Sequence, residues 1–166
     1  MRILIDINHP AHVHYFRNFY HLMTAKGHSI EVVARNKEIE HKLLDAYHIP
    51  FIDRGKGKEG KLGKFFYMVY AVLKLYRIAR RFRPDLFLNF LHPYPSMVAK
   101  MLGKPSYVFS DTEHATLHHK LTVPFATRIF TPACYRDDLG HKHQRFPSYM
   151  ELSYLHPNYF NPNRDI

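Results

Sequence analysis

Short apolar segments alternate with longer amphipathic segments along most of the chain. The short segments are four to six residues long and predict buried strands, whereas apolar positions spaced by three and four residues predict helices. Strands that alternate with helices are typical of βαβ units, so the pattern predicts an α/β fold: an open parallel sheet of about six strands with helices on both faces. The predicted strands are Arg2–Ile7, Ser29–Ala34, Pro50–Asp53, Leu86–Phe90, Ser106–Phe109 and Arg128–Thr131. The predicted helices are His12–Lys26, Lys37–Tyr47, Leu62–Phe82, Ser96–Leu102 and Thr112–Leu121.

The end of the chain has a different character. Residues 146–166 are rich in proline and aromatic side chains, and their pattern contains no further strand followed by a helix. We therefore expect one domain over residues 1–145, and a wrapping tail or an interdomain hinge over residues 146–166.

Composition narrows the class of protein. Hydrophobic residues make up 46% of the chain and aromatic residues 15%, which excludes wholesale disorder. The single cysteine, Cys134, cannot form an internal disulfide and fits a reducing compartment. No secretory signal is evident, and the longest apolar run, Phe65–Leu73, is too short to span a bilayer. These features predict a cytoplasmic protein.

The chain is strongly basic. It has 24 Lys and Arg against 14 Asp and Glu, which gives a formal net charge of +10. Such a charge favours anionic partners: nucleic acid, acidic lipid headgroups or phosphorylated substrates. The sequence contains no recognisable nucleic-acid-binding module, so the other two classes are favoured.

A cluster of polar side chains follows the first predicted strand. In an open parallel sheet, ligands bind at the turn after the carboxyl end of a strand. We predict that Asn8 and His9 bind substrate there, that His12 is catalytic, and that His14 packs on the sheet. Asn8 and His9 have a second interpretation, as caps of the following helix. No metal site is expected, because His12 and His14 face different directions on a helix and no cysteine or carboxylate pair completes a tetrahedral set.

The segment after the fifth predicted strand carries further candidates. Asp111 and His114 are typical of a general base or of groups that orient a hydroxyl, and we predict that both are catalytic. Ser110 and Glu113 have the spacing of a capping box, which gives both a structural interpretation. Glu113 is also a candidate for substrate binding.

Two more candidates follow the fourth predicted strand. His92 and Ser96 are predicted to bind substrate, although the same residues suit a rigid turn and a helix start. Histidines near polar partners at three strand ends favour one shared crevice.

The segment Gly55–Lys61 satisfies two phosphate-binding patterns, G-x-G-x-x-G and G-x-x-x-x-G-K. A P-loop needs Ser or Thr after its lysine, whereas this chain has Leu62. A dinucleotide fingerprint follows the first strand, whereas this segment follows the third. We therefore expect a solvated basic loop.

The predicted helix Leu62–Phe82 has more apolar surface than one packed face requires. Its first half is apolar nearly all round, which is typical either of a helix on a membrane surface or of complete burial, and both interpretations stay open. The predicted core stripe is Phe65, Met68, Val72, Leu75, Ala79 and Phe82. The candidate membrane or anion contacts are Lys56, Lys58, Lys61, Lys64, Lys74, Arg77 and Arg81.

Four segments carry a resemblance to a known family. They read ILIDINHPAHVHYFRN, SDTEHA, ATRIFTP and YLHPNYFNP. In these motifs the chain resembles the domain-of-unknown-function 354 family, which is similar in build to the glycosyltransferase-B superfamily, to sugar-nucleotide 2-epimerases and to lipid-linked sugar transferases. The resemblance implies a Rossmann-like domain that corresponds to the N-terminal half of a glycosyltransferase-B fold. It also implies an absent C-terminal domain, or a complementary subunit, that holds most of the nucleotide-sugar donor.

The resemblance also implies a function. We expect a domain of a glycosyltransferase-like protein that transfers a sugar from a nucleotide donor to an acceptor in surface polysaccharide or glycolipid synthesis. His12 or Asp111 would accept the proton of a phosphorylated or lipid-linked acceptor. The domain is expected to be inactive alone, to hold no tightly bound cofactor, and to lie peripherally on the inner face of the cell membrane. The alternatives are half of a sugar-nucleotide 2-epimerase, and a non-catalytic basic domain that binds acidic lipid or nucleic acid.

Overall fold

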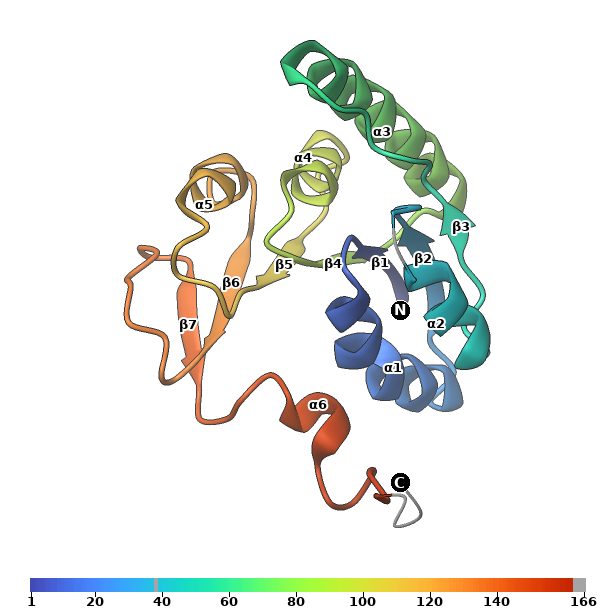
Figure 1. Ribbon diagram of the computed structural model, residues 1–166, viewed down its shortest axis with the longest axis vertical. Helices are drawn as coiled ribbons and strands as arrows, with labels where there is room; N and C mark the ends of the chain where they lie inside the picture. The colour runs from blue at the N-terminus through green and yellow to red at the C-terminus, as the bar shows by residue number, and fades with distance from the viewer. Residues whose placement is uncertain (38, 163–166) are drawn as a thin grey trace.

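The computed structural model describes residues 1–37 and 39–162, and within these ranges it contains one sheet of seven parallel strands (Figure 1). The strand order is β3-β2-β1-β4-β5-β6-β7, and each neighbouring pair is parallel. The strands are β1 (Arg2–Ile7), β2 (Ser29–Ala34), β3 (Ile52–Asp53), β4 (Leu86–Phe90), β5 (Ser106–Phe109), β6 (Arg128–Pro132) and β7 (His143–Phe146).

Helices cover both faces of this sheet. Figure 1 shows α1 and α2 on one face and α3, α4 and α5 on the other, while α6 lies on the side of α1. The helices are α1 (Pro10–Ala25), α2 (Glu40–Ala46), α3 (Lys61–Phe82), α4 (Pro93–Met101), α5 (Thr116–Thr122) and α6 (Leu152–Leu155). The predicted open parallel sheet with two covered faces is confirmed.

Local differences from the predicted elements have physical causes. The sequence pattern does not predict β7, because this edge strand is half-exposed and reads as a polar segment. α1 and α4 begin earlier than predicted, at Pro10 and Pro93, because the fixed φ of proline suits the first position of a helix.

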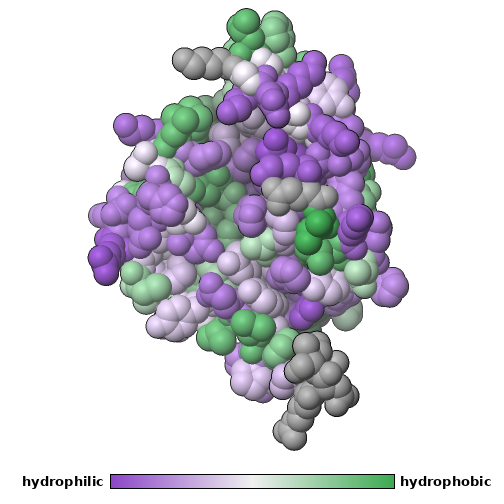
Figure 2. Space-filling view, in the orientation of Figure 1, coloured by the Kyte–Doolittle hydropathy of each residue, from purple (hydrophilic) through white to green (hydrophobic). Residues whose placement is uncertain are grey.

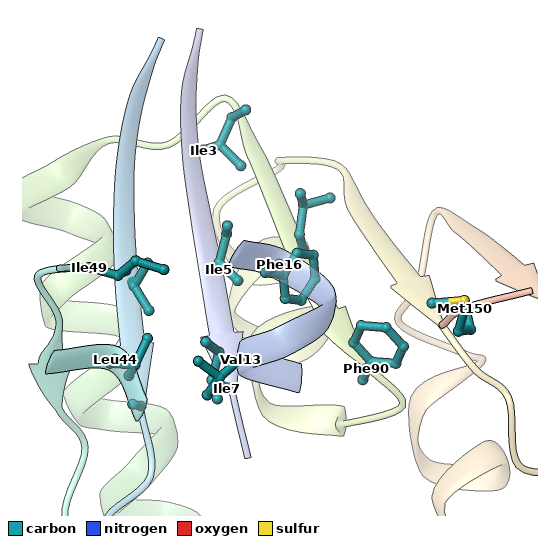
Figure 3. Close-up of a cluster of buried hydrophobic side chains, with 12 residues drawn as sticks. Ile3, Ile5, Ile7, Val13, Phe16, Leu44, Ile49, Phe90 and Met150 are labelled. Carbon is teal, nitrogen blue, oxygen red and sulfur yellow. The ribbon is translucent and has the colours of Figure 1, made fainter. Parts of the chain in front are cut away.

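β1 illustrates how one strand contributes to two cores. Ile3, Ile5 and Ile7 pack towards α1, whereas Leu4 packs with residues of α3 and α4 on the opposite face. Successive side chains of a strand point to opposite faces, so a strand covered on both sides is apolar without alternation. Figure 3 shows Ile3, Ile5 and Ile7 beside the side chains of α1.

The packed face of α3 differs from the predicted stripe. Tyr67, Ala71, Leu75 and Ala79 are buried at steps of four residues, whereas Phe65 is 55% exposed and does not belong to the core. The four-residue steps keep the buried positions on one helix face where the helix crosses the sheet. The predicted stripe is therefore wrong at its first position.

The first half of α3 extends past the sheet (Figure 1). Apolar side chains are exposed there, so the interpretation of complete burial is wrong. They are Leu62, Phe65, Phe66, Val69, Tyr70 and Leu73. Figure 2 shows hydrophobic side chains at the end of the molecule where α3 begins, with hydrophilic ones around them.

Paired substitutions test this orientation of α3. Leu75→Ala removes a fully buried side chain and is expected to lower the free energy of unfolding by about 2–5 kcal/mol. Phe65→Ala, which is the matched control, is expected to change it by less than about 0.5 kcal/mol, because the ring is exposed. Urea denaturation measures both, and equal losses would contradict the orientation.

Candidate functional site

The strand order reverses direction between β1 and β4. From β1 the chain continues outward to β2 and β3, and it then returns to β4 on the other side of β1. In open parallel sheets, ligands bind outside the carboxyl ends of the strands at such a switch point. The turns after β1 and β4 carry His9 and His92, so the predicted histidines lie at the position where this fold binds ligands.

A buried ion pair lies beneath these turns. Asp6 is the penultimate residue of β1, Arg54 directly follows β3, and neither side chain is exposed. Arg54 Nη1 donates to both carboxylate oxygens of Asp6 at 2.7 Å. Burial raises the pKa of the Asp6 carboxyl, and the Arg54 guanidinium opposes this shift. Removing either partner would leave a buried charge without compensation.

The ion pair also holds the β1–α1 turn. Asn8 Nδ2 donates to Asp6 Oδ2 at 3.0 Å, and Arg54 Nη2 donates to Asn8 Oδ1. Both polar ends of the Asn8 amide are therefore engaged within the protein. Asn8 therefore positions the turn, and its contact with substrate stays a prediction.

His9 is exposed and caps α1. Its Nδ1 accepts a hydrogen bond from the Ala11 backbone N–H at 3.2 Å. The capping interpretation of His9 is confirmed. With Nδ1 engaged, the other ring nitrogen, Nε2, makes no hydrogen bond to the described residues, and the ring lies at the surface at the switch point.

His12 packs against an aromatic ring. Its imidazole stacks on Phe90, the last residue of β4, with 4.7 Å between the ring centroids. Burial, together with the neighbouring His9, lowers the pKa of His12 to about 3. The ring is therefore neutral near pH 7, and a proton bound to it would be held weakly.

His92 is still more enclosed. Its Nδ1 lies 3.6 Å from Asp6 Oδ2, and its ring packs edge-on against Tyr94 with centroids 4.2 Å apart. Burial, followed by the charge of Arg54, lowers the pKa of His92 well below its ordinary value. The structure places this predicted substrate contact beside the buried ion pair.

Asp111 reaches the same region from the other side. The Tyr15 hydroxyl of α1 donates to Asp111 Oδ2 at 3.1 Å, and the Thr112 hydroxyl donates to Oδ1 at 3.0 Å. The ring of Tyr15 stacks on Phe90 with centroids 4.8 Å apart. His12 of α1 stacks on Phe90 as well, so α1 carries His12 directly on this ring and ties Asp111 to it through the hydroxyl of Tyr15.

Three other predicted site residues lie in different settings. Ser96 is fully buried, and its hydroxyl is 2.8 Å from the Ser106 hydroxyl, so it is part of the interior and not of a ligand surface. Glu113 Oε1 accepts from the Arg136 backbone N–H at 3.3 Å and thereby ties the Asp111 segment to the turn after β6. His114 is exposed.

The capping-box interpretation of Ser110 and Glu113 is wrong. α5 begins only at Thr116, and Ser110 is buried with its hydroxyl 3.3 Å from His119 Nε2. The Tyr135 hydroxyl lies 3.0 Å from the same nitrogen. This cluster, which the sequence pattern does not reveal, anchors the start of the Asp111 segment.

The sequence pattern also fails to predict the role of Arg54. A single arginine after a two-residue strand looks like any basic loop residue. The available signal is Asp6, a carboxylate within an otherwise apolar strand, because such a group needs a cationic partner when buried.

The basic candidates form a surface apart from Asp111. Lys56, Lys58 and Lys64 are exposed in the loop before α3 and on its first turns, and Arg77 and Arg81 are exposed near its other end. Lys74 lies between them with its Nζ 5.6 Å from the centre of the Tyr70 ring. The side chain of Lys61 is outside the described part of the structure.

The described residues offer neither a metal site nor a membrane span. Within residues 1–37 and 39–162, no three His, Cys, Asp or Glu side chains form a group that could hold a metal ion. None of the helices in these ranges combines the length and the apolar character that crossing a membrane requires.

The buried ion pair gives a stability prediction. Arg54→Met leaves the Asp6 carboxyl buried without its cation and is expected to lower the free energy of unfolding by about 3–5 kcal/mol. The double variant Asp6→Asn with Arg54→Met is expected to recover part of this loss. Arg80→Met, at an exposed position of α3, is the control. Equal stability of the Arg54 and Arg80 variants by urea denaturation would contradict the assignment.

Comparison with known proteins identifies relatives of this chain. A protein of Methanocaldococcus jannaschii, described as uncharacterised, is 28% identical over 132 residues, which are 78% of this chain and 38% of that protein. The UDP-N-acetylglucosamine–N-acetylmuramyl-(pentapeptide) pyrophosphoryl-undecaprenol N-acetylglucosamine transferase of Pseudomonas fluorescens is 30% identical over 114 residues, 63% of this chain and 32% of that enzyme. The chain thus spans about a third of the length of these relatives.

Solved structures show the same fold. The UDP-GlcNAc 2-epimerase of Neisseria meningitidis superposes with a TM-score of 0.64 at 15% identity, over 80% of this chain and 40% of that one. MurG of Acinetobacter baumannii superposes with a TM-score of 0.64 at 14% identity, over 83% of this chain and 44% of that one. At these identities the likeness concerns the fold, which corresponds to the Rossmann-like N-terminal half of a glycosyltransferase-B protein. The family described as "Protein of unknown function (DUF354)" matches residues 1–146, and the chain therefore belongs to the DUF354 family.

Proposed function

We propose that this chain is the acceptor-side domain of a glycosyltransferase that moves a sugar from a nucleotide donor to a hydroxyl group in surface polysaccharide or glycolipid synthesis. The observation that carries the proposal is that α1 brings the two candidates together: His12 and Tyr15 both stack on Phe90, and the Tyr15 hydroxyl donates to Asp111 of the β5–α5 segment. The likeness to a named N-acetylglucosamine transferase supports this reaction class.

Asp111 is the better candidate for the base. Its carboxylate is exposed, and hydrogen bonds from Tyr15 and Thr112 hold it in place. Burial and the bonded carboxylate raise the pKa of Tyr15. This hydroxyl therefore keeps its proton and donates a hydrogen bond to Asp111. His12 is the poorer candidate, because its ring is partly buried and stacked on Phe90, whereas the Asp111 carboxylate is exposed. In the proposed reaction, the acceptor hydroxyl attacks the anomeric carbon of the sugar, Asp111 accepts its proton, and the bond to the nucleotide breaks so that the nucleoside diphosphate leaves with the bonding electrons. His12 and His114 stay further catalytic candidates.

The donor half of the site belongs to the rest of the proposed enzyme. The chain spans 44% of the MurG chain that it resembles, so a second domain or a complementary subunit would hold most of the nucleotide sugar. The domain alone would then be inactive. The nucleotide sugar is a substrate in this scheme, and no tightly bound cofactor is proposed.

An epimerase is the second candidate. Its support is the superposition on the N. meningitidis 2-epimerase, which is as close as that on MurG. In the transferase reading, sugar from UDP-N-acetylglucosamine appears on a lipid-linked acceptor. In the epimerase reading, the sugar is altered with no acceptor present. Product analysis with and without acceptor separates the two readings.

Substitution of the proposed base tests the mechanism. In the polypeptide or complex that carries both halves, Asp111→Asn is expected to lower kcat for sugar transfer by about 10²- to 10⁴-fold, because the proton acceptor is lost. Asp45→Asn makes the same chemical change at an exposed position of α2 and serves as control. Melting temperatures verify that both variants fold. Unchanged turnover of the Asp111 variant would reject the role.

We also propose that α3 docks the protein peripherally on an anionic membrane, where a lipid-linked acceptor would be met. Leu62, Phe66, Val69 and Leu73 follow one helix face at steps of four, three and four, and each is at least 42% exposed. Arg77 continues this face, and the lysines before α3 lie at its other end. Exposed apolar side chains flanked by cations are typical of helices that lie in the headgroup region.

Vesicle sedimentation tests the membrane contact. The chain is expected to bind vesicles that contain phosphatidylglycerol, and to bind neutral phosphatidylcholine vesicles more weakly. Phe66→Ser with Leu73→Ser is expected to weaken binding at least about tenfold, since each ring or chain contributes roughly 1.5–3 kcal/mol when buried. Leu117→Ser, on the exposed face of α5, is the control. Equal binding of variant and wild type would rule out α3 as the docking surface.

A further inference from the structure

A cavity of about 200 Å³ lies beside the Asp111 segment, between α1, the ends of β4 and β5, and the segment after β7. Its walls are almost entirely apolar and include five aromatic rings, three from α1 and one each from β4 and β5. Among the lining residues are Tyr15, Phe16, Phe90, Phe109, Met150 and Ser153. Figure 3 shows Phe16, Phe90 and Met150 coming together from α1, β4 and the segment after β7.

The segment after β7 is fixed as a wall of this cavity. The Asn18 side chain of α1 donates to the Ser153 backbone carbonyl at 2.8 Å. The ring of Tyr154 lies 5.4 Å from the ring of His14 and 5.7 Å from that of Tyr15. Met150 is buried against the core. These contacts hold the wall to α1, so the cavity is a defined feature of the fold.

One polar atom in the wall has no partner. The Ser153 hydroxyl oxygen is buried, and it makes no hydrogen bond to any described residue. An unpaired buried hydroxyl is unfavourable unless a partner reaches it. Ser153 lines the cavity, and a serine side chain has three staggered rotamers, so rotation about Cα–Cβ would turn this hydroxyl towards a partner inside the cavity.

The cavity adjoins the proposed base through a shared side chain. The ring of Tyr15 forms part of the wall, while its hydroxyl donates to Asp111 at 3.1 Å. A molecule in the cavity therefore lies one side chain away from the carboxylate. This links the cavity to the site without making it part of the His12 or Asp111 machinery.

We propose that the cavity binds a compact apolar group of a ligand, such as a single aromatic ring or a short branched alkyl chain, with one hydroxyl or carbonyl directed at Ser153. An apolar cavity of about 150 Å³ is large enough for benzene, so the volume here admits a ring with one small substituent. The further step, that this group belongs to the acceptor whose hydroxyl faces Asp111, rests on the proposed function.

Phenol and toluene are suitable probes for the cavity. They have nearly the same size, and only phenol has a hydroxyl that can pair with Ser153. The 166-residue chain, labelled with ¹³C at its methionine methyl groups, is titrated with each probe by NMR, and Met150→Leu assigns the Met150 signal. Both probes are expected to shift the Met150 methyl signal saturably.

Variants at Ser153 separate the two parts of the proposal. Ser153→Ala removes only the hydroxyl, and it is expected to weaken phenol binding by about three- to tenfold while toluene binding stays within about twofold. Ser153→Leu fills the cavity and is expected to abolish binding of both probes. Ser148→Leu, on the same segment but outside the cavity, is the control and is expected to bind both probes like wild type.

Defined outcomes would overturn the proposal. The proposal is overturned if neither probe shifts the Met150 methyl signal saturably. It is also overturned if Ser153→Leu binds the probes as tightly as wild type does. If thermal melting shows that Ser153→Leu is unfolded, the phenol-to-toluene ratio of Ser153→Ala decides instead, and an unchanged ratio overturns the role of Ser153.

The titration with phenol and toluene tests the cavity separately from the proposed transferase function. Asp111→Asn is expected to leave toluene binding within about twofold, because the carboxylate does not line the cavity. Probe binding without any sugar transfer would defeat the proposed function alone. Sugar transfer without probe binding would defeat the cavity proposal alone.

Discussion

The buried pair of Asp6 and Arg54 is the constraint on which the carboxyl edge of this sheet depends. A carboxylate at the end of a central strand has no access to water and needs a cationic partner, which Arg54, the residue after β3, supplies. The ion pair joins the end of β1 to the edge of the sheet across β2. It also engages both ends of the Asn8 amide and so fixes the turn that presents His9 and His12.

A second level of organisation is aromatic. Phe90 ends β4 and contacts rings from α1 and β5, so one side chain connects the first turns of α1 with the end of β5. Rings stacked in this way fix distances between loops that make few direct hydrogen bonds with one another. The same ring borders the apolar cavity. The wall of the candidate site and the wall of the cavity are therefore two sides of one aromatic cluster.

The sequence was sufficient for the fold class and for the position of the candidate site, because both follow from periodicity and from the ends of buried strands. It was insufficient where a residue's role depends on distant partners. Arg54 has no local signature, Ser96 looks like a surface helix start although it is fully buried, and the spacing of Ser110 and Glu113 matches a cap that does not form. At β7, a polar edge strand has no apolar pattern to reveal it. The exposure of Phe65 depends on where α3 leaves the sheet, which helical periodicity does not encode.

The enclosure of two imidazoles at the switch point makes this domain sensitive to acid. His12 takes up a proton in the folded state only near pH 3, whereas in the unfolded chain it does so near its ordinary value of 6.5, and the pKa of His92 is lowered in the same direction. Unfolding therefore consumes protons between these limits. The contribution of these histidines to the free energy of unfolding is complete above about pH 6.5 and declines as the pH falls towards 3. The packing of His12 on Phe90 therefore stabilises the domain most at neutral pH.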